Sequence, residues 1–390
     1  MKPYVKGDFL AIAKTDSTVQ WVRFDLDEPF CGETDHRHHR WSALIYRRAE
    51  IPHMQITRQP SPSHIWNQID KPRGVGSVEE DLGDHRTRRI KLPNRQFTTL
   101  HSGGGFFESP RWHDGRWFVS DFYKHQVLSI EEDGSVHFEM HVENQPSGIG
   151  WLPDGSMLVV SMKDHCILRK AVDGSVSVHA RLGQYCRGPL NDLVVDGEGN
   201  AWVGDFGFDL MSFQDPSSTN LILIRPNRET VVVADQMQFP NGMVIKDGNT
   251  LVVGETLGCR YTAFDINEDG TLSNRRVFAQ LAPTPKLGTF TEVLPQITVA
   301  PDGCTMDANG NIWMADALGN RLLHIEAGGA ILEEVRAPEG LGFFACMLGG
   351  SDGKTLLACA APDFMEANRI LSDDAVLLVT KVETPHGGRP

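Results

Sequence analysis

Short apolar runs alternate with turns rich in Gly, Asn and Asp from about residue 95 to the end of the chain. In the clearest example the polar pair Asn191 and Asp192 precedes the apolar run 193–195, a turn at 196–200 and a second apolar run at 201–204. Two β-favouring runs around such a turn predict a β-hairpin. The polar pair lies where the first strand of that hairpin is predicted to start.

The same pattern recurs five more times. The first two copies match at a shift of 40 residues, which aligns His125 with His165 at a position that we assign to a turn. A period near 40 with four short strands per unit predicts an all-β fold, a six-bladed β-propeller. The other copies begin at Glu108, Pro146, Pro240, Pro301 and Ala345.

One strand is left over at each end of the six units, at 96–100 and at 375–382. We expect the two to join one blade, since such closure removes exposed sheet edges. Two segments interrupt the period, at 209–220 and at 282–298. The second is long and carries several apolar residues, so it predicts a lid over a site and not a disordered linker.

Residues 1–90 show no hairpin period, and we predict a poorly structured or irregular extension there, followed by the propeller over 91–390. The segment 35–41 contains three histidines, but no carboxylate or cysteine is spaced to complete a metal site with them. A solvated basic loop is therefore the favoured interpretation of that segment.

Composition excludes several function classes. The 390 residues carry a formal charge of −14, which argues against nucleic acid or an anionic membrane as a partner. The sequence holds no long apolar run and no clear signal peptide. Seven cysteines without a CxxC pair favour reduced thiols, and hence a cytoplasmic location. The oligomeric state stays open.

Polar residues recur at the starts of four units, where propeller topology gathers equivalent positions around the central channel. They are Glu108, Asn191, Asn241 and Asp302. Each alone is also an ordinary turn residue. Two carboxylates and two amides around one channel need a partner, because like charges repel and buried polar groups cost free energy. All-oxygen ligands favour Ca²⁺, with Zn²⁺, Mg²⁺ and Mn²⁺ as alternatives.

These motifs carry a family resemblance. From about residue 95 to 382 the chain resembles the SMP-30/gluconolactonase/luciferin-regenerating-enzyme family. The resemblance implies a six-bladed propeller with one divalent cation on its axis, ligated by Glu108, Asn241 and Asp302, with Asn191 touching metal or substrate. It also implies hydrolysis of a small-molecule lactone. The motifs are Glu108-Ser-Pro-Arg-Trp112, Leu190-Asn-Asp-Leu-Val-Val-Asp196, Phe239-Pro-Asn-Gly-Met243 and Pro301-Asp-Gly-Cys-Thr-Met-Asp307.

One position departs from the sugar-lactone pattern of that family. An arginine commonly stands two residues before the asparagine of the third unit, but here that residue is Pro189, and the nearest arginine is Arg187. Gluconolactone is therefore a doubtful substrate, and a more apolar pocket is one interpretation. Its candidate aromatic residues, for most of which the blade core is the other interpretation, are Trp112, Phe122, Phe206, Phe208, Phe343 and Phe344.

The predicted chemistry is attack of an activated water on a lactone, with Asp302 as general base and Asn191 as a hydrogen-bond donor. A metal-dependent phosphotriesterase or organophosphate hydrolase is an alternative, as is a non-enzymatic propeller that binds protein partners. A metal-free condensing propeller resembling strictosidine synthase is a further alternative, against which the paired Glu108 and Asp302 argue.

Overall fold

The computed structural model describes residues 9–15, 18–24, 78–81, 87–90 and 95–390. The chain divides into two units, 1–74 and 75–390. In the first unit β1 (Phe9–Thr15) and β2 (Thr18–Phe24) form an antiparallel hairpin. The second begins with the hairpin of β3 (Val78–Asp81) and β4 (Thr87–Ile90). The histidine-containing segment 35–41 lies outside the described residues, and the character of the extension stays a prediction.

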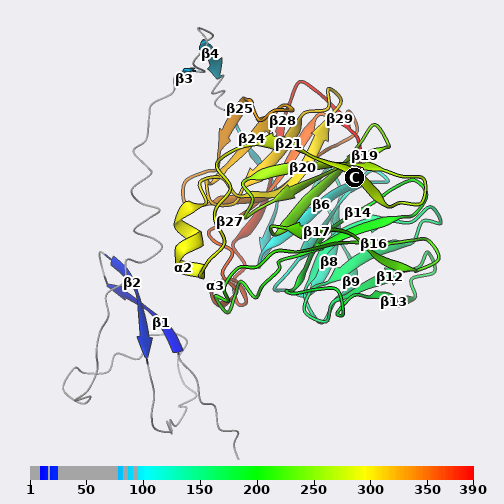
Figure 1. Cartoon of the computed structure of the whole chain (residues 1–390), viewed down its shortest axis with the longest axis horizontal. Coiled ribbons are helices and arrows are strands. Elements are labelled where there is room, and N and C mark those ends of the chain that lie inside the picture. The colour runs from blue at the N-terminus through cyan, green and yellow to red at the C-terminus, as the bar shows by residue number, and fades with distance from the viewer. Residues whose placement is uncertain (1–8, 16–17, 25–77, 82–86, 91–94) are drawn as a thin grey trace, which may run out of the picture. The chain divides into compact units, whose positions relative to one another are not determined.

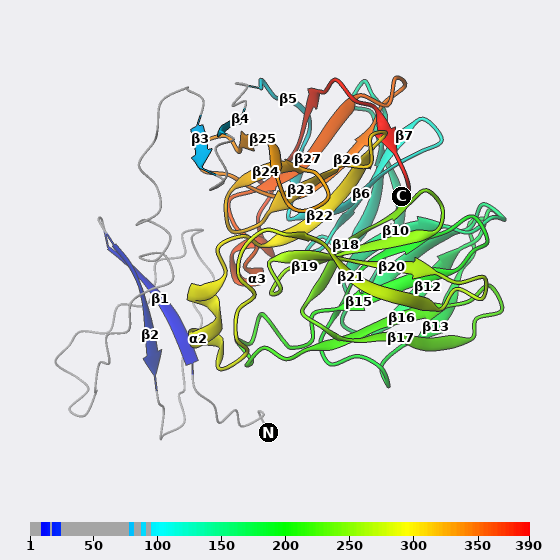
Figure 2. The same ribbon diagram turned by 45° about the horizontal axis from the view of Figure 1, so that its top comes forward.

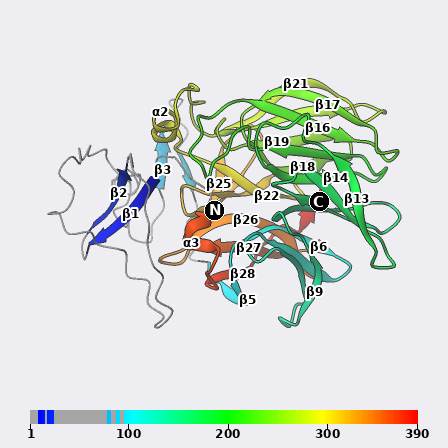
Figure 3. The same ribbon diagram turned by 90° about the horizontal axis from the view of Figure 1, so that it is seen from below.

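Six antiparallel sheets follow one another around a common centre and confirm the predicted six-bladed propeller (Figures 1 and 3). Each of the first four blades is built from four consecutive strands, the first innermost. Blade 1 contains β6 (Phe107–His113), β7 (Arg116–Asp121), β8 (Gln126–Ile130) and β9 (Val136–His141), and blade 2 contains β10 (Pro146–Trp151), β11 (Met157–Ser161), β12 (Cys166–Lys170) and β13 (Val176–Arg181). Blade 3 contains β14 (Leu190–Val195), β15 (Ala201–Asp205), β16 (Thr219–Ile224) and β17 (Thr230–Met237), and blade 4 contains β18 (Pro240–Lys246), β19 (Thr250–Glu255), β20 (Arg260–Ile266) and β21 (Leu272–Gln280).

The last two blades also use strands from the chain ends. Blade 5 contains β22 (Pro301–Asp307), β23 (Ile312–Asp316), β24 (Arg321–Ile325), β25 (Ile331–Arg336) and the short β29 (His386–Gly387). Blade 6 contains β26 (Gly342–Gly349), β27 (Thr355–Ala361), β28 (Ala375–Lys381) and β5 (Thr98–Gly104). The pairing of β28 with β5 confirms the predicted closure of one blade by strands from both ends.

The C-terminal tail adds a feature that the sequence pattern did not predict. β29 pairs with the inner edge of β22 at Met306 and Asp307, and Arg389 pairs with Ile245 at the end of β18. The tail thus joins the inner strands of blades 4 and 5 at the ends opposite to Asn241 and Asp302, which lie near the strand starts.

Each innermost strand is bulged near its start. In blades 3, 4 and 5 the register shifts directly after Leu190, Pro240 and Pro301, and in blade 1 it shifts after Glu108. A bulge re-aims side chains and ends regular pairing, which suits a site at a sheet end. The strands β18 and β22 also approach each other closely at this end. A Cβ atom added to Gly242 would lie only 2.6 Å from the backbone oxygen of Asp302, so only glycine fits there.

Burial follows the same inside-to-outside order. The inner strands β14 and β26 are buried along their whole length, whereas Phe138 on the outer strand β9 is 63% exposed. The repeat position shared by His125 and His165 has positive φ values of 56° and 51°, which confirms its assignment to a turn. Three short helices lie in the connections on one side of the propeller (Figure 2): α2 (Phe290–Val293), the 3₁₀ helix η1 (Leu294–Gln296) and α3 (Glu366–Arg369).

Candidate functional site

A cavity of roughly 860 Å³, open solvent at its mouth included, lies where the inner strands begin. Glu108, Asn191, Asn241 and Asp302 all line it. The structure therefore brings the four polar residues singled out by the repeat pattern together, from blades 1, 3, 4 and 5. Their chemical roles stay predictions.

Fixed hydrogen bonds orient the two amides. Asn191 Nδ2 donates to the carbonyl oxygen of Pro240 at 3.2 Å, an atom that only accepts. Asn241 Nδ2 donates to Thr256 Oγ1 at 3.1 Å, and that hydroxyl in turn donates to the carbonyl oxygen of Pro301 at 2.6 Å. These contacts fix which end of each amide is nitrogen. Among the described residues, the Oδ1 atoms of Asn191 and Asn241 accept no hydrogen bond from the protein.

Glu108 is buried and Asp302 is partly buried, and neither carboxylate forms an ion pair within the described residues. Burial raises the pKa of Glu108 well above its usual range, and the nearby charge of Asp302 raises it further. Burial also raises the pKa of Asp302 to about 8, although its hydrogen bond with Asn241 acts in the opposite direction. In the described part of the chain, the backbone N–H of Ser109 is the one donor at hydrogen-bond distance from Glu108, at 3.0 Å.

These donors fit a hard divalent cation. The set consists of two carboxyl groups with raised pKa values and two amide oxygens without hydrogen bonds. All of its ligand atoms are oxygens, which Ca²⁺ prefers. Within the described residues, no group of three or more His, Cys, Asp or Glu side chains is arranged to hold a metal ion. A cation here would therefore depend on the amide oxygens of Asn191 and Asn241 as well as on Glu108 and Asp302.

A closed ion pair lies next to this cluster. Arg111 Nη2 donates to Asp192 Oδ1 at 2.6 Å, and both side chains are buried. The other guanidinium contacts go to the carbonyl oxygens of Ile149, Pro110 and Leu193 at 2.9–3.0 Å. Asp192 also accepts the backbone N–H of Leu193 at 2.8 Å. The charges of Arg111 and Asp192 balance each other and their hydrogen bonds are made within the protein, so this pair is not a candidate ligand site.

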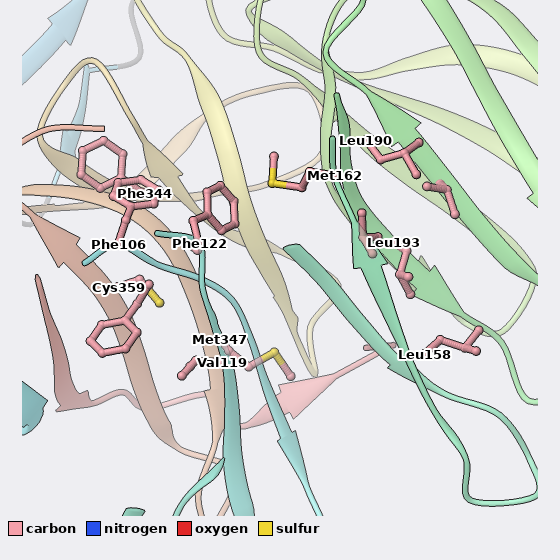
Figure 4. Packing of buried hydrophobic residues seen from close by; sticks show 14 of the residues in the cluster. Phe106, Val119, Phe122, Leu158, Met162, Leu190, Leu193, Phe344, Met347 and Cys359 are labelled. Atoms are coloured by element: carbon pink, nitrogen blue, oxygen red, sulfur yellow. The ribbon is translucent and has the colours of Figure 1, made fainter. Parts of the chain in front are cut away.

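We call Glu108, Asn191, Asn241 and Asp302 the polar floor of the cavity. Aromatic side chains form the walls above it. Of the predicted candidates, Phe122, Phe206, Phe208 and Phe344 line the cavity. Figure 4 shows Phe122 and Phe344 gathered beside Phe106, with Leu190 and Leu193 on the other side of the view.

The other two aromatic candidates do not line this cavity. Trp112 packs on Trp117 with ring centroids 4.7 Å apart, and Phe343 packs on Phe97 at 5.3 Å. For these two residues the blade-core interpretation holds, because each ring packs at a tilt against a neighbour within or beside its own blade. Arg187, the candidate substitute for a sugar-binding arginine, is not a lining residue either, and its Nη1 donates to the carbonyl oxygen of Ser218 at 2.9 Å.

Two insertions supply lining residues that the sequence analysis did not identify individually. The 282–298 segment contributes Phe290, Leu294 and Ile297, and the 209–220 segment contributes Leu210 and Met211. The predicted lid segment thus lies at the cavity. The signal that would have marked these residues is the run of apolar side chains inside segments that break the repeat.

Comparison with known protein families shows to which family the chain is related. A sequence model of the SMP-30/Gluconolactonase/LRE-like region matches residues 106–361, which is more than half of the chain. The chain belongs to this family. The match confirms the resemblance inferred from the motifs, and it covers every residue of the polar floor.

Other family members are distant in sequence. Regucalcin of Xenopus laevis is 26% identical over 266 residues, which is 66% of this chain and 84% of regucalcin. A pentonolactonase of Haloferax volcanii is 26% identical over 238 residues, which is 59% of this chain and 73% of the relative.

Solved structures share the fold. A luciferin-regenerating enzyme has a TM-score of 0.60 at 18% identity and covers 76% of this chain and 98% of its own. A calcium-binding regucalcin of Agrobacterium tumefaciens has a TM-score of 0.61 at 16% identity and covers 76% and 97% of the two chains. At such identities the similarity supports the propeller fold and no further property.

Two findings bear on the expected cellular setting. No helix in the described part of the chain is long and apolar enough to cross a membrane. The six cysteines among the described residues are free thiols, at 166, 186, 259, 304, 346 and 359. The cytoplasmic location inferred from the cysteine pattern stays a prediction.

Proposed function

We propose that this chain is a divalent-cation-dependent hydrolase that opens lactones. One observation carries the proposal: among the described residues, two carboxylates outside any ion pair and two amide oxygens without hydrogen bonds line the floor of one cavity. Burying such a set is costly unless a cation completes it. The names of the relatives, a regucalcin and a pentonolactonase, are consistent with this chemistry.

Glu108, Asn241 and Asp302 would hold the cation, Ca²⁺ being the best match to their oxygens, with Asn191 beside them. When bound, a divalent cation would polarise the lactone carbonyl group and stabilise negative charge on its oxygen. Asn191 keeps a second amide N–H that is not needed for Pro240 and can orient the substrate or the attacking water.

Asp302 is the proposed general base. Its carboxylate would accept a proton from the attacking water as the water oxygen bonds to the carbonyl carbon. The bond from that carbon to the ring oxygen then breaks, and the proton on Asp302 passes to the ring oxygen. The product is an open hydroxy acid, and Asp302 returns to its starting state.

A substrate panel tests the reaction class. Purified full-length protein should hydrolyse lactones in the presence of Ca²⁺ and lose this activity after chelation, with recovery when the ion is restored. Aryl phosphotriesters in the same assay test the alternative hydrolase. Turnover of phosphotriesters without turnover of any lactone would contradict the proposal, and so would full lactonase activity in metal-free protein.

A further inference from the structure

The walls of the cavity point to a substrate class. We infer that the substrate is an uncharged lactone carrying a large apolar substituent, and not a polyhydroxylated or acidic sugar lactone. This inference rests on the proposed lactonase function for the reaction, but it draws on different residues, those above the polar floor.

Two aromatic pairs stand on opposite sides of the channel. Phe106 and Phe344, from blades 1 and 6, have ring centroids 4.9 Å apart, and Phe206 and Phe239, from blades 3 and 4, are 4.3 Å apart. All four line the cavity. In a ring of six blades, blades 1 and 6 face blades 4 and 3. The floor is thus flanked by two aromatic walls, which suit an apolar group between them.

The roof is apolar as well and is held together by contacts between two insertions. The ring of Phe290 on α2 lies 5.4 Å from that of Phe213, and its backbone N–H donates to Asp215 Oδ1 at 2.8 Å. Leu210 and Leu294 line the cavity from the same two segments. A substituent that leaves the floor therefore meets apolar side chains along its path.

Apart from Glu108, Asn191, Asn241 and Asp302, two hydroxyl groups of the cavity are already committed to hydrogen bonds within the protein. Tyr123 donates its hydroxyl to the carbonyl oxygen of Phe364 at 3.0 Å, and Thr256 donates to that of Pro301. No Lys, Arg or His is among the residues that line this cavity in the described part of the chain. A carboxylate or phosphate on the substituent would therefore be buried between apolar walls without a cationic side chain beside it, which costs free energy.

Hydroxyl groups on the substrate would also weaken its binding. Each hydroxyl buried against phenylalanine rings without a partner lowers binding, typically by roughly tenfold. A sugar lactone carries several of them, whereas an alkyl or aryl substituent gains from the same walls. Each buried CH₂ group should raise kcat/KM roughly threefold to fourfold.

Three lactones with the same six-membered ring provide the test: δ-valerolactone, its pentyl-bearing homologue δ-decalactone, and glucono-δ-lactone. With full-length protein and Ca²⁺, kcat/KM for δ-decalactone should exceed that for δ-valerolactone by roughly 10²–10³-fold, the larger value applying if the whole pentyl group is buried. Glucono-δ-lactone should be the poorest of the three. A kcat/KM for glucono-δ-lactone equal to or above that for δ-decalactone would overturn the inference and leave the lactonase proposal standing.

Binding separates this inference from the reaction itself. A pentyl-substituted δ-lactam is a stable analogue, and it should raise the melting temperature of the protein more than the unsubstituted lactam does. If no lactone is hydrolysed but the pentyl lactam still stabilises the protein more strongly, the proposed function fails while the substrate class is supported. Equal effects of the two lactams would overturn the substrate class.

A matched pair of variants locates the effect. Phe290→Ala removes a roof side chain and should lower the ratio of kcat/KM for δ-decalactone to that for δ-valerolactone by roughly tenfold. Phe138→Ala removes an equal side chain that is 63% exposed on the outer strand of blade 1, and it should leave the ratio unchanged. An unchanged ratio in folded Phe290→Ala protein, judged by its melting temperature, would argue against the roof as part of the apolar site.

Discussion

Two buried carboxylates on the inner strands of blades 1 and 3 differ in what surrounds them. Glu108 on β6 and Asp192 on β14 are 8% and 5% exposed. Asp192 accepts from Arg111 at 2.6 Å and from the backbone of Leu193, so its charge is balanced inside the protein. Glu108 accepts one backbone N–H and faces Asp302, and its pKa is raised by burial.

The comparison separates a structural acid from one kept for a ligand. A buried charge with a partner and filled hydrogen bonds holds elements together, and losing one partner is costly. A buried acid without a partner lowers stability and is expected where an ion or a substrate completes it. Substitutions at the two clusters should therefore affect different measurements.

The largest expected effect is on lactone turnover when a residue of the polar floor is changed. Asp302→Asn keeps the size and one oxygen but removes the charge and the proton acceptor. Lactone turnover should fall by about 10²–10⁴-fold, the usual worth of positioned proton transfer. Steady-state kinetics at saturating Ca²⁺ measures it. Near-parental turnover with the ion bound would show that Asp302 is not the base.

At the ion pair of Arg111 and Asp192 the expected effect is on the stability of the fold. Asp192→Asn leaves Arg111 buried without its counter-charge, and the free energy of unfolding should drop by about 3–5 kcal/mol. Denaturant unfolding followed by fluorescence measures the change. The double variant Arg111→Met with Asp192→Leu should recover part of the loss, because no charge then stays unpaired. An unaffected Asp192→Asn single variant would remove the distinction drawn here.

A smaller effect is expected from Asn241→Asp. The side chain keeps a ligating oxygen and adds a negative charge, so it should bind the cation at least as tightly as the parent does. The extra charge makes the ion a weaker Lewis acid, and turnover should fall less than in Asp302→Asn. Calcium titration together with kinetics measures both quantities. Weaker binding in Asn241→Asp would argue that Oδ1 does not face the ion.

A further expected effect is a dependence of metal-free stability on pH. The pKa of Asp302 is about 8 in the folded protein, against an ordinary value of 3.8. The folded form therefore keeps a proton that the unfolded chain releases, and this contribution to stability is lost as pH rises from about 4 to about 8. Melting temperatures of chelated protein should show the loss in the parent and a reduced loss in Asp302→Asn. Parallel curves would contradict it.

Much of the fold could be predicted, because each blade repeats one hairpin pattern and the closing strands at 96–100 and 375–382 were left without partners. The four floor residues were recognisable for the same reason, since a repeat places Asn191, Asn241 and Asp302 at equivalent positions beside the bulges of β14, β18 and β22.

Outside the repeat, a lid at 282–298 could be predicted, but the contacts that place its side chains could not. Phe290 reaches the cavity through a loop whose path depends on its contacts with Phe213 and Asp215, residues far away in sequence. The pairing of β29 with β22 depends on an inner edge that exists only in the closed ring. Trp112 and Phe343 do not line the cavity and pack against the rings of Trp117 and Phe97, which apolar patterning alone does not reveal.

The central claim is that Glu108 and Asp302, together with the two amides, form a cation site. Calorimetric titration of chelated full-length protein with Ca²⁺ tests it most directly, with the double variant Glu108→Gln and Asp302→Asn as the comparison. The account predicts one ion per chain in the parent and no measurable binding in the double variant, with both proteins folded. Equal binding by the two proteins, or no binding of any divalent cation by the parent, would contradict it.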